Sequence, residues 1–244
     1  MDDVGQQAPW PQRAVVFGAS GAIGGALCRQ LVEGGATVMA GSRSGTAIGG
    51  ATGFRFDLMD EGSIASIAAE LKEVPPDCVI VATGSLTLPE GTGPEKSLKQ
   101  LSPDAMAQAF ALNTIGPAMI AKHFLPIMPR DRRSVFAALS ARVGSISDNR
   151  LGGWHSYRAS KTALNMLIRN FAIEMRRTHE HAIIVGMHPG TVNSNLSKPF
   201  QANLPAGQLT DPDDAACNLL AVIGKLEPHN SGNVFDWQGR EIPA

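Results

Sequence analysis

Short apolar runs rich in β-branched residues alternate with longer segments whose apolar residues recur at helical spacing, along the whole chain of 244 residues. No two apolar runs are close enough for a tight hairpin. Strands that alternate with helices are typical of repeated βαβ units, in which helices cover a mostly parallel sheet. The pattern therefore predicts an α/β fold, as a single doubly wound domain with about seven strands.

The predicted elements follow one another without a stretch long enough to link two domains. Strands are predicted at residues 14–18, 37–40, 54–57, 78–82, 134–139, 182–187 and 233–236. Helices are predicted at residues 23–33, 63–73, 103–125, 157–177 and 211–226. Segments 41–53 and 86–98 are rich in Gly, Pro, Ser and Thr, which predicts loops. We expect residues 1–12 to form a flexible tail and residues 13–244 to form the domain.

Composition narrows the class of protein. A hydrophobic content of 43% with 18% charged residues excludes a disordered chain, and a net charge of -1 argues against nucleic acid as a partner. No apolar run approaches the roughly 18 residues of a membrane span, and the polar amino terminus is unlike a signal peptide. The three cysteines have no metal-site or disulfide spacing. We therefore expect a soluble cytoplasmic protein with no membrane contact and no metal site.

A glycine-rich stretch follows the first predicted strand and opens the first predicted helix, as a dinucleotide fingerprint requires. Glycines there allow a tight turn and close backbone approach to a pyrophosphate, while the helix amino terminus adds its dipole and free N–H groups. The alternative is a strand-to-helix turn without a ligand. The candidate cofactor-binding residues in this stretch are Gly18, Ser20, Gly21, Ile23 and Gly24.

The charge beside the second strand distinguishes between the nicotinamide dinucleotides. No Asp or Glu occurs from Gly34 to Phe56, while Ser42 and Arg43 lie where the adenosine ribose is expected. An arginine accepts a 2′-phosphate, whereas an acidic residue binds a 2′-hydroxyl, so NADP(H) is favoured and NAD(H) stays the alternative. Arg43 could instead be a solvated loop cation. Asp57 and Leu58 are candidates for holding the adenine, unless Asp57 only caps the next helix.

Candidate acid/base chemistry lies at the start of the fourth predicted helix. Tyr157, the only tyrosine, and Lys161 are one turn apart and share a helix face. A phenol with a pKa near 10 needs a neighbouring positive charge to work at neutral pH. At about 5 Å and a dielectric of about 20, a lysine charge contributes roughly 3 kcal/mol, which lowers the pKa by about two units. Chance placement of the two residues is the alternative.

Four motifs occur in order: Gly18-Ala-Ser-Gly-Ala-Ile-Gly24, Asn113-Thr-Ile-Gly, Tyr157-Arg-Ala-Ser-Lys161 and His188-Pro-Gly-Thr191. Together they make the chain resemble a short-chain dehydrogenase/reductase over about residues 13–240. Segments 139–149, 150–154 and 235–239 are more narrowly similar to the bacterial C-factor-like, cell-signalling branch.

The resemblance implies a Rossmann sheet of order 3-2-1-4-5-6-7 and hydride transfer between nicotinamide C4 and the carbonyl of a small molecule. It implies that Tyr157 donates the proton, that Lys161 lowers the tyrosine pKa and binds the ribose, and that Asn113 holds a proton-relay water. It also implies a homodimer or homotetramer packed through the long helices. The remaining cofactor contacts that it implies are Ala82, Thr83, Gly84, Pro189, Gly190 and Thr191.

Departures from the family pattern concern the serine that orients the substrate oxygen. Ala141 occupies its usual place, three residues before a glycine. Ser140 is the candidate catalytic serine, although adjacent strand residues face opposite sides, and Ser145 is the second candidate. The usual Asn-Ala-Gly reads Ala-Thr-Gly at 82–84. The resemblance places a substrate lid at 196–209, where few charges favour a largely neutral substrate.

Three functions follow, in decreasing order of support. The first is an NADP(H)-dependent oxidoreductase that interconverts a carbonyl and an alcohol with Tyr157 as acid/base. The second is a dinucleotide-binding signalling or sensor protein with little catalysis, which the C-factor resemblance and Ala141 favour. The third is a lyase or epimerase on the same fold, since fold alone does not determine the reaction.

Overall fold

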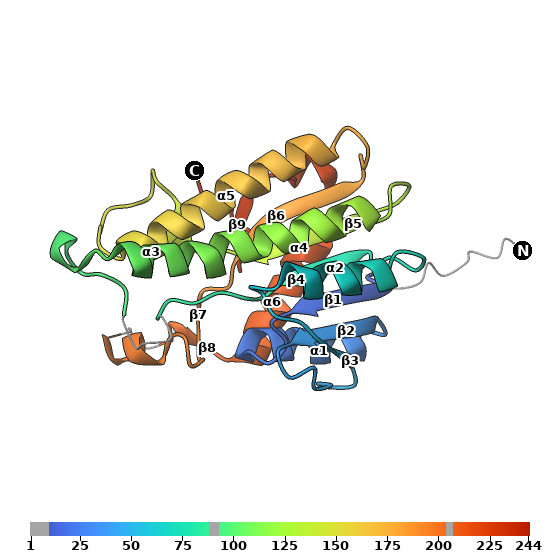
Figure 1. Cartoon of the computed structure of the whole chain (residues 1–244), viewed down its shortest axis with the longest axis horizontal. Helices are drawn as coiled ribbons and strands as arrows, with labels where there is room; N and C mark the ends of the chain where they lie inside the picture. The colour runs from blue at the N-terminus through green and yellow to red at the C-terminus, as the bar shows by residue number, and fades with distance from the viewer. Residues whose placement is uncertain (1–9, 88–92, 204–206) are drawn as a thin grey trace, which may run out of the picture.

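A seven-stranded parallel sheet forms the centre of the computed structural model, which describes residues 10–87, 93–203 and 207–244 (Figure 1). The strand order is β3-β2-β1-β4-β5-β6-β9. The strands are β1 (Arg13–Phe17), β2 (Thr37–Ser42), β3 (Thr52–Arg55), β4 (Cys78–Val81), β5 (Ser134–Leu139), β6 (Ala182–His188) and β9 (Val234–Asp236). This order confirms the predicted doubly wound sheet.

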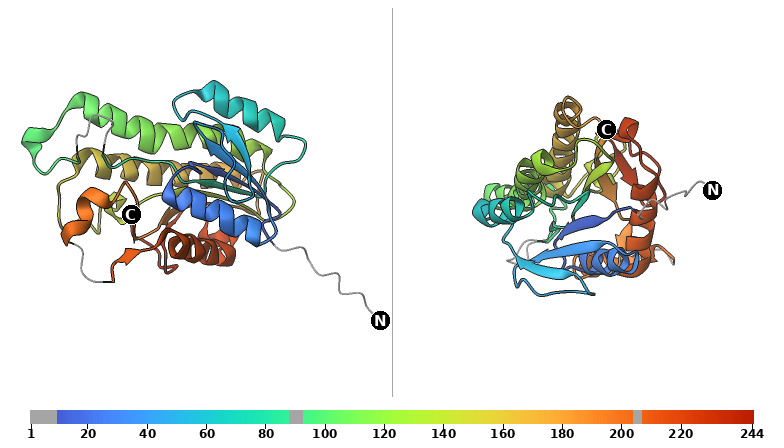
Figure 2. Two further views of the ribbon diagram at one scale, coloured as in Figure 1. Left: turned by 90° about the horizontal axis from the view of Figure 1, so that it is seen from below. Right: turned by 90° about the vertical axis from the view of Figure 1, so that its right-hand side faces the viewer.

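Helices cover both faces of the sheet, as the end-on view in Figure 2 shows. Helices α1 and α6 pack on one face, and α2, α4 and α5 pack on the other. The helices are α1 (Ala22–Glu33), α2 (Glu61–Glu70), α3 (Pro103–Phe110), α4 (Gly116–Phe124), α5 (His155–Met175) and α6 (Pro212–Lys225). None of the helices in the described part of the chain is long and apolar enough to cross a membrane.

The two cores follow from alternation along each strand. In β1, Ala14 and Val16 face α1 and α6, while Val15 and Phe17 face the other helix layer. Both sides of a central parallel strand are buried, which is why these strands read as continuous apolar runs. The ring of Phe17 makes edge-to-face contacts with Phe54, Phe56 and Phe124, at centroid distances of 5.5, 4.9 and 5.1 Å.

The structure corrects the predicted helix at 103–125. A π-helical turn at Ala111–Ile115 separates α3 from α4. Pro117 has no backbone N–H, so the carbonyl of Asn113, four residues earlier, has no α-helical donor and the turn widens. Periodicity alone does not reveal this change, because apolar positions continue through the turn.

Three smaller differences concern boundaries. Strand β3 begins at Thr52, two residues before the predicted start, so the loop after β2 is shorter than expected. A second, two-stranded sheet was not predicted; its strands are β7 (Thr191–Val192) and β8 (Leu209–Thr210). Within the predicted tail, Trp10 packs against the core and under Arg133, whose Cζ lies 3.6 Å from the ring centroid. Residues 1–9 of that tail lie outside the described residues.

Candidate active site

Two glycines hold the turn between β1 and α1. Gly18 has a φ of +88°, and a Cβ built on it would lie 2.9 Å from the backbone of Ala82. A Cβ on Gly24 would lie 2.2 Å from the Gly18 oxygen, so the first turn of the helix packs directly on the loop. The N–H groups of Gly18 and Ala19 both donate to the oxygen of Gly41 at the end of β2. Both positions therefore need glycine.

The amino terminus of α1 adjoins an open cavity of about 330 Å³, which residues 19–22 line together with Asp211 and the ion pair of Arg29 and Asp213. No side chain caps this helix end at Gly21, so its first N–H groups and the positive end of its dipole are available to an anion. Ser20 is exposed beside the cavity, whereas Ile23 packs into the core. Close to the glycine turn, Thr83 Oγ1 is buried without a hydrogen-bond partner. These features fit the phosphates of a dinucleotide.

The end of β2 carries an exposed cation. Arg43 directly follows the strand and forms no ion pair with another described residue. Ser42 is buried, and its Oγ accepts the N–H of Gly45 at 3.1 Å. Since the Gly41 carbonyl ties this strand end to the glycine turn, Arg43 lies beside the loop that would hold the pyrophosphate.

The turn after β3 does not place Asp57 as a helix cap. Its Oδ1 accepts the N–H of Met59 at 2.9 Å, while Asp60 caps α2 by accepting the N–H of Gly62. The capping role considered for Asp57 is therefore wrong. Leu58 packs on the start of α4, where a Cβ on Gly116 would lie 2.4 Å from the leucine Cγ.

Tyr157 and Lys161 lie near the start of α5. Lys161 is 4% exposed, its Nζ donates to Leu139 O at 2.8 Å, and a Cβ on Gly84 would lie 3.4 Å from this nitrogen. Burial lowers the pKa of Lys161 to about 8. Burial also raises the pKa of Tyr157 to about 12, which is opposite to the predicted lowering. The Tyr157 side chain is partly buried, and the lysine ammonium is directed at the Leu139 carbonyl.

Asn113 joins the π-helical turn to the end of β4 and to α5. Its Oδ1 accepts the N–H of Ser85 at 2.8 Å, and its Nδ2 donates to Ser85 O at 2.9 Å and to Ser160 Oγ at 3.2 Å. Ser160 Oγ in turn donates to Tyr157 O at 2.8 Å. Both Nδ2 hydrogens of Asn113 are therefore engaged, which leaves only its oxygen atoms for the water predicted there.

The two candidate serines lie beside α5, and each has a local partner. Ser140 Oγ donates to Asn165 Oδ1 at 2.6 Å, and Ser145 Oγ accepts the N–H of Asp148 at 3.1 Å. Among the residues that the structure describes, neither hydroxyl is hydrogen-bonded to Tyr157. Ser140 as the catalytic serine therefore stays a prediction.

The segment after β6 turns sharply at Pro189 and Gly190. Gly190 has a φ of +78°, and a Cβ on it would lie 3.1 Å from Cδ1 of Trp237. Thr191 begins β7, whose pairing with β8 closes the base of the predicted lid, and Asn193 N donates to the oxygen of Thr210 there. Residues 204–206 of this lid lie outside the described residues.

Sequence reasoning missed Glu95, a buried carboxylate at the start of α5. Its Oε2 accepts the N–H of Ser156 at 3.1 Å, and its Oε1 accepts the Ser156 hydroxyl. Burial acts to raise the pKa of Glu95, but hydrogen bonds to the carboxylate, chiefly from Ser156, together with the nearby charge of His155 hold the pKa below its ordinary value. The partners are 61 positions apart, so no local pattern could have indicated this contact.

Comparisons with known proteins agree with this geometry. The short chain dehydrogenase family matches residues 12–205. The C-signal protein of Myxococcus xanthus is 36% identical over 138 residues, which cover 57% of this chain and 78% of that protein. The 1-hydroxy-2-glutathionyl-2-methyl-3-butene dehydrogenase of a Rhodococcus species is 30% identical over 224 residues, which cover 89% of this chain and 93% of that enzyme.

Solved structures share the fold at lower identity. The carbonyl reductase Sniffer of D. melanogaster superposes with a TM-score of 0.81 at 17% identity and covers 96% of this chain and 99% of its own. An NADPH-bound carbonyl reductase from chicken fatty liver has a TM-score of 0.80 at 22% identity, with coverage of 96% and 94%. At these identities the likeness concerns the fold.

Proposed function

This chain belongs to the short-chain dehydrogenase family and is a dehydrogenase/reductase, and we propose that it interconverts a carbonyl and an alcohol with NADP(H). The match to C-signal confirms its resemblance to the C-factor-like branch. One observation carries the proposal. Tyr157 and the buried Lys161 occupy the start of α5, and Lys161 lies at the ends of β4 and β5, on the sheet edge where the glycine turn opens.

The residues present fit the cofactor. The glycine turn and the open end of α1 would hold the pyrophosphate, and Arg43 would contact the 2′-phosphate. Lys161 would hydrogen-bond the nicotinamide ribose in place of the Leu139 carbonyl. When bound, NADPH supplies the hydride that reduces the carbonyl carbon.

Tyr157 would supply the proton for the carbonyl oxygen. With burial raising its pKa to about 12, the phenol is protonated at neutral pH, as a general acid must be. With a pKa of about 8, Lys161 is still mostly protonated at pH 7, and its charge would stabilise the phenolate left after proton donation. Asn113 and Ser160 would fix the helix turn that carries Tyr157.

A second function, a dinucleotide-binding sensor with little catalysis, is favoured by one observation. Ala141 has no hydroxyl, and the hydroxyl of Ser140, the candidate catalytic serine, donates to Asn165 Oδ1. A carbonyl oxygen would then be oriented by Tyr157 alone. This reading predicts tight NADPH binding without turnover.

The test combines cofactor titration with a panel of aldehydes and ketones. We expect NADPH to bind more tightly than NADH and to be consumed with at least one carbonyl. Tyr157→Phe removes only the acid, so turnover should fall by about 100-fold or more while the NADPH Kd stays within about twofold. Retained turnover in Tyr157→Phe would remove the proposed acid. Binding without turnover across the panel would favour the sensor.

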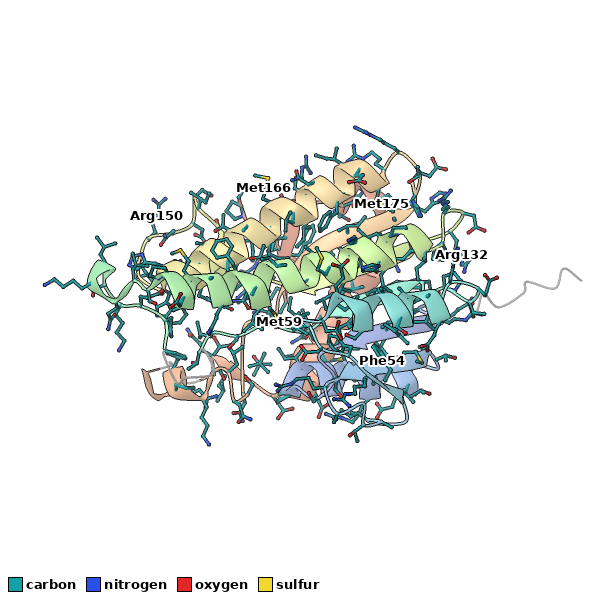
Figure 3. The ribbon with its side chains drawn as sticks, viewed as in Figure 1. Phe54, Met59, Arg132, Arg150, Met166 and Met175 are labelled. Atoms are coloured by element: carbon teal, nitrogen blue, oxygen red, sulfur yellow. The ribbon has the colours of Figure 1, made fainter. Side chains whose placement is uncertain are left out.

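A homodimer or homotetramer remains part of the proposal. Met166, on the outer face of α5, is 61% exposed, and Ile173 on the same helix is 47% exposed (Figure 3). Large apolar side chains on a long surface helix support a contact with a second copy.

A further inference from the structure

The turn that leads into α5 places a tryptophan in an unfavourable backbone conformation. Trp154 has a φ of 51°, and among the described residues it is the only non-glycine residue with a positive φ. Gly152 and Gly153, with φ of 62° and 65°, precede it. The left-handed conformation is unfavourable for a bulky residue, so the surrounding contacts must hold it there.

Contacts on both sides of the turn hold Trp154. Its N–H donates to Glu95 O at 2.5 Å, and the Glu95 carboxylate accepts two hydrogen bonds from Ser156. Arg158 Nε donates to the oxygens of Gly152 and Gly153 at 3.2 and 3.1 Å. The side chains of Glu95 and Arg158 are thus both engaged in hydrogen bonds that hold the turn.

The turn brings the Trp154 ring between two other aromatic rings. Its centroid lies 6.3 Å from that of Tyr157, with an interplanar angle of 70°, and 5.3 Å from that of Phe200, with an angle of 57°. Phe200 comes from the 3₁₀ segment Lys198–Asn203 in the predicted lid, at the same end of the molecule as the start of α5 (Figure 1). All three side chains are only partly buried, so ring surface stays accessible.

We propose that Trp154 and Phe200 form an aromatic wall that binds a flat, uncharged aryl group on the carbonyl carbon, so that aryl aldehydes and ketones are preferred. This inference rests on the proposed reductase function. Aromatic groups in edge-to-face or offset contact gain affinity beyond the area they bury, by about two- to twelvefold, and a saturated ring of the same size does not gain it. Because Trp154 also contacts Tyr157, the wall holds the aryl group beside the proton donor.

Two ketones of the same size separate aryl recognition from simple apolar contact: acetophenone and cyclohexyl methyl ketone. The measured quantity is the ratio of the kcat/KM value for acetophenone to that for cyclohexyl methyl ketone. The two ketones differ in intrinsic reactivity, but that difference is the same for every variant and does not affect a change in the ratio. In Trp154→Leu the ratio should fall about tenfold, and in Phe200→Leu about threefold. The matched control is Leu151→Ala, three residues before Trp154 and 91% exposed, which should leave the ratio unchanged.

An unchanged ratio in both Trp154→Leu and Phe200→Leu would overturn the wall. If kcat/KM fell by the same factor for the two ketones, Trp154 would be a structural residue. Because Phe200 lies on a separate segment, its variant keeps the test valid even if Trp154→Leu folds poorly.

A binding measurement distinguishes this failure from that of the reductase function. Tyr157→Phe, with and without NADP⁺, is titrated with each ketone while tryptophan fluorescence is recorded. Acetophenone should bind more tightly than cyclohexyl methyl ketone and should change the tryptophan fluorescence. This change should disappear in the double variant that carries both Tyr157→Phe and Trp154→Leu. If the wild-type enzyme neither bound nor oxidised NADPH, the reductase function would be contradicted. The difference in binding between the two ketones would then still test the aromatic wall. Equal binding of the two ketones would contradict the wall itself.

Discussion

The proposed site has two halves, a nucleotide side and a substrate side, which are built in different ways. On the nucleotide side, Gly18, Gly24 and the end of β2 form the site from backbone groups in a short stretch of chain. On the substrate side, Glu95, Trp154 and Phe200 come from three segments and meet only through side-chain and long-range contacts. The nucleotide side therefore depends on the absence of side chains, and the substrate side depends on particular ones.

The strongest test of the nucleotide side is to add a single methyl group. In Gly24→Ala the new Cβ would lie 2.2 Å from the Gly18 oxygen, so α1 must move away from the loop. Such overpacking costs about 3 kcal/mol or more, and we expect NADPH affinity to fall by about 100-fold or more. Fluorescence titration measures the Kd, and circular dichroism checks folding.

Gly224→Ala is the matched control, because nothing lies within 4 Å of the Cβ it would add to α6. It should leave NADPH binding unchanged and stabilise the fold by about 0.5–1 kcal/mol. If Gly24→Ala bound NADPH as tightly as wild type, backbone approach would not build the nucleotide side.

The matching test of the substrate side removes one charge. Glu95→Gln keeps the size of the side chain but weakens two hydrogen bonds at the start of α5. Hydrogen bonds to a buried charge contribute about 1.5–3 kcal/mol, so we expect kcat/KM for a carbonyl to fall about tenfold or more. NADPH Kd should stay within about twofold of wild type, since the nucleotide contacts are elsewhere. Glu73→Gln, at an exposed position, is the control.

The pH dependence of stability gives Glu95→Gln a second readout. The pKa of Glu95 is held below its ordinary value of 4.5, so its contribution to the free energy of unfolding is fully present above that pH. The contribution is lost as the pH falls through the folded-state pKa. The stability difference from wild type should thus be constant near neutrality and shrink in acid. If Glu95→Gln lowered NADPH affinity by the same factor as kcat/KM, the two halves of the site would not be separate.

Lys161→Met tests whether the buried lysine of the substrate side lowers the free energy of unfolding. Burial lowers the pKa of Lys161 from 10.5 to about 8, which corresponds to about 3 kcal/mol of destabilisation at pH 7. The lost hydrogen bond to Leu139 O offsets about 1 kcal/mol. The inactive variant should therefore be about 2 kcal/mol more stable than wild type, as measured by urea unfolding at pH 7.

The sign of this effect is checked by raising the pH. The unfolded chain keeps its lysine protonated up to about pH 10.5, whereas the folded protein releases that proton above about pH 8. Wild-type destabilisation is therefore complete below pH 8 and fades between pH 8 and 10.5, so the advantage of Lys161→Met should shrink there. If Lys161→Met were less stable than wild type at pH 7, the claim that the buried lysine charge destabilises the fold would be contradicted.

The same contrast explains what the sequence predicted. The alternation of strands and helices, the glycine turn and the Tyr157/Lys161 spacing depend on local pattern. The strand order, which the family resemblance implied, is confirmed. The π-helical turn at Ala111–Ile115 and the Glu95 contact depend on groups that a local pattern does not pair. The direction of the Tyr157 pKa was wrong because spacing gives the distance to a charge but not the extent of burial.

The smallest expected effect separates the two cofactors on the nucleotide side. Arg43→Ala removes the exposed cation after β2, where no acidic residue lies within 34–56. A solvent-exposed phosphate contact contributes about 1 kcal/mol, so NADPH affinity should fall about five- to tenfold while NADH affinity stays unchanged. Arg132→Ala is the control, because Arg132 precedes β5 whereas Arg43 follows β2, at the opposite edge of the parallel sheet (Figure 3). Because this contact is made by a side chain, equal loss of both cofactors would show that Arg43 supports the backbone loop instead.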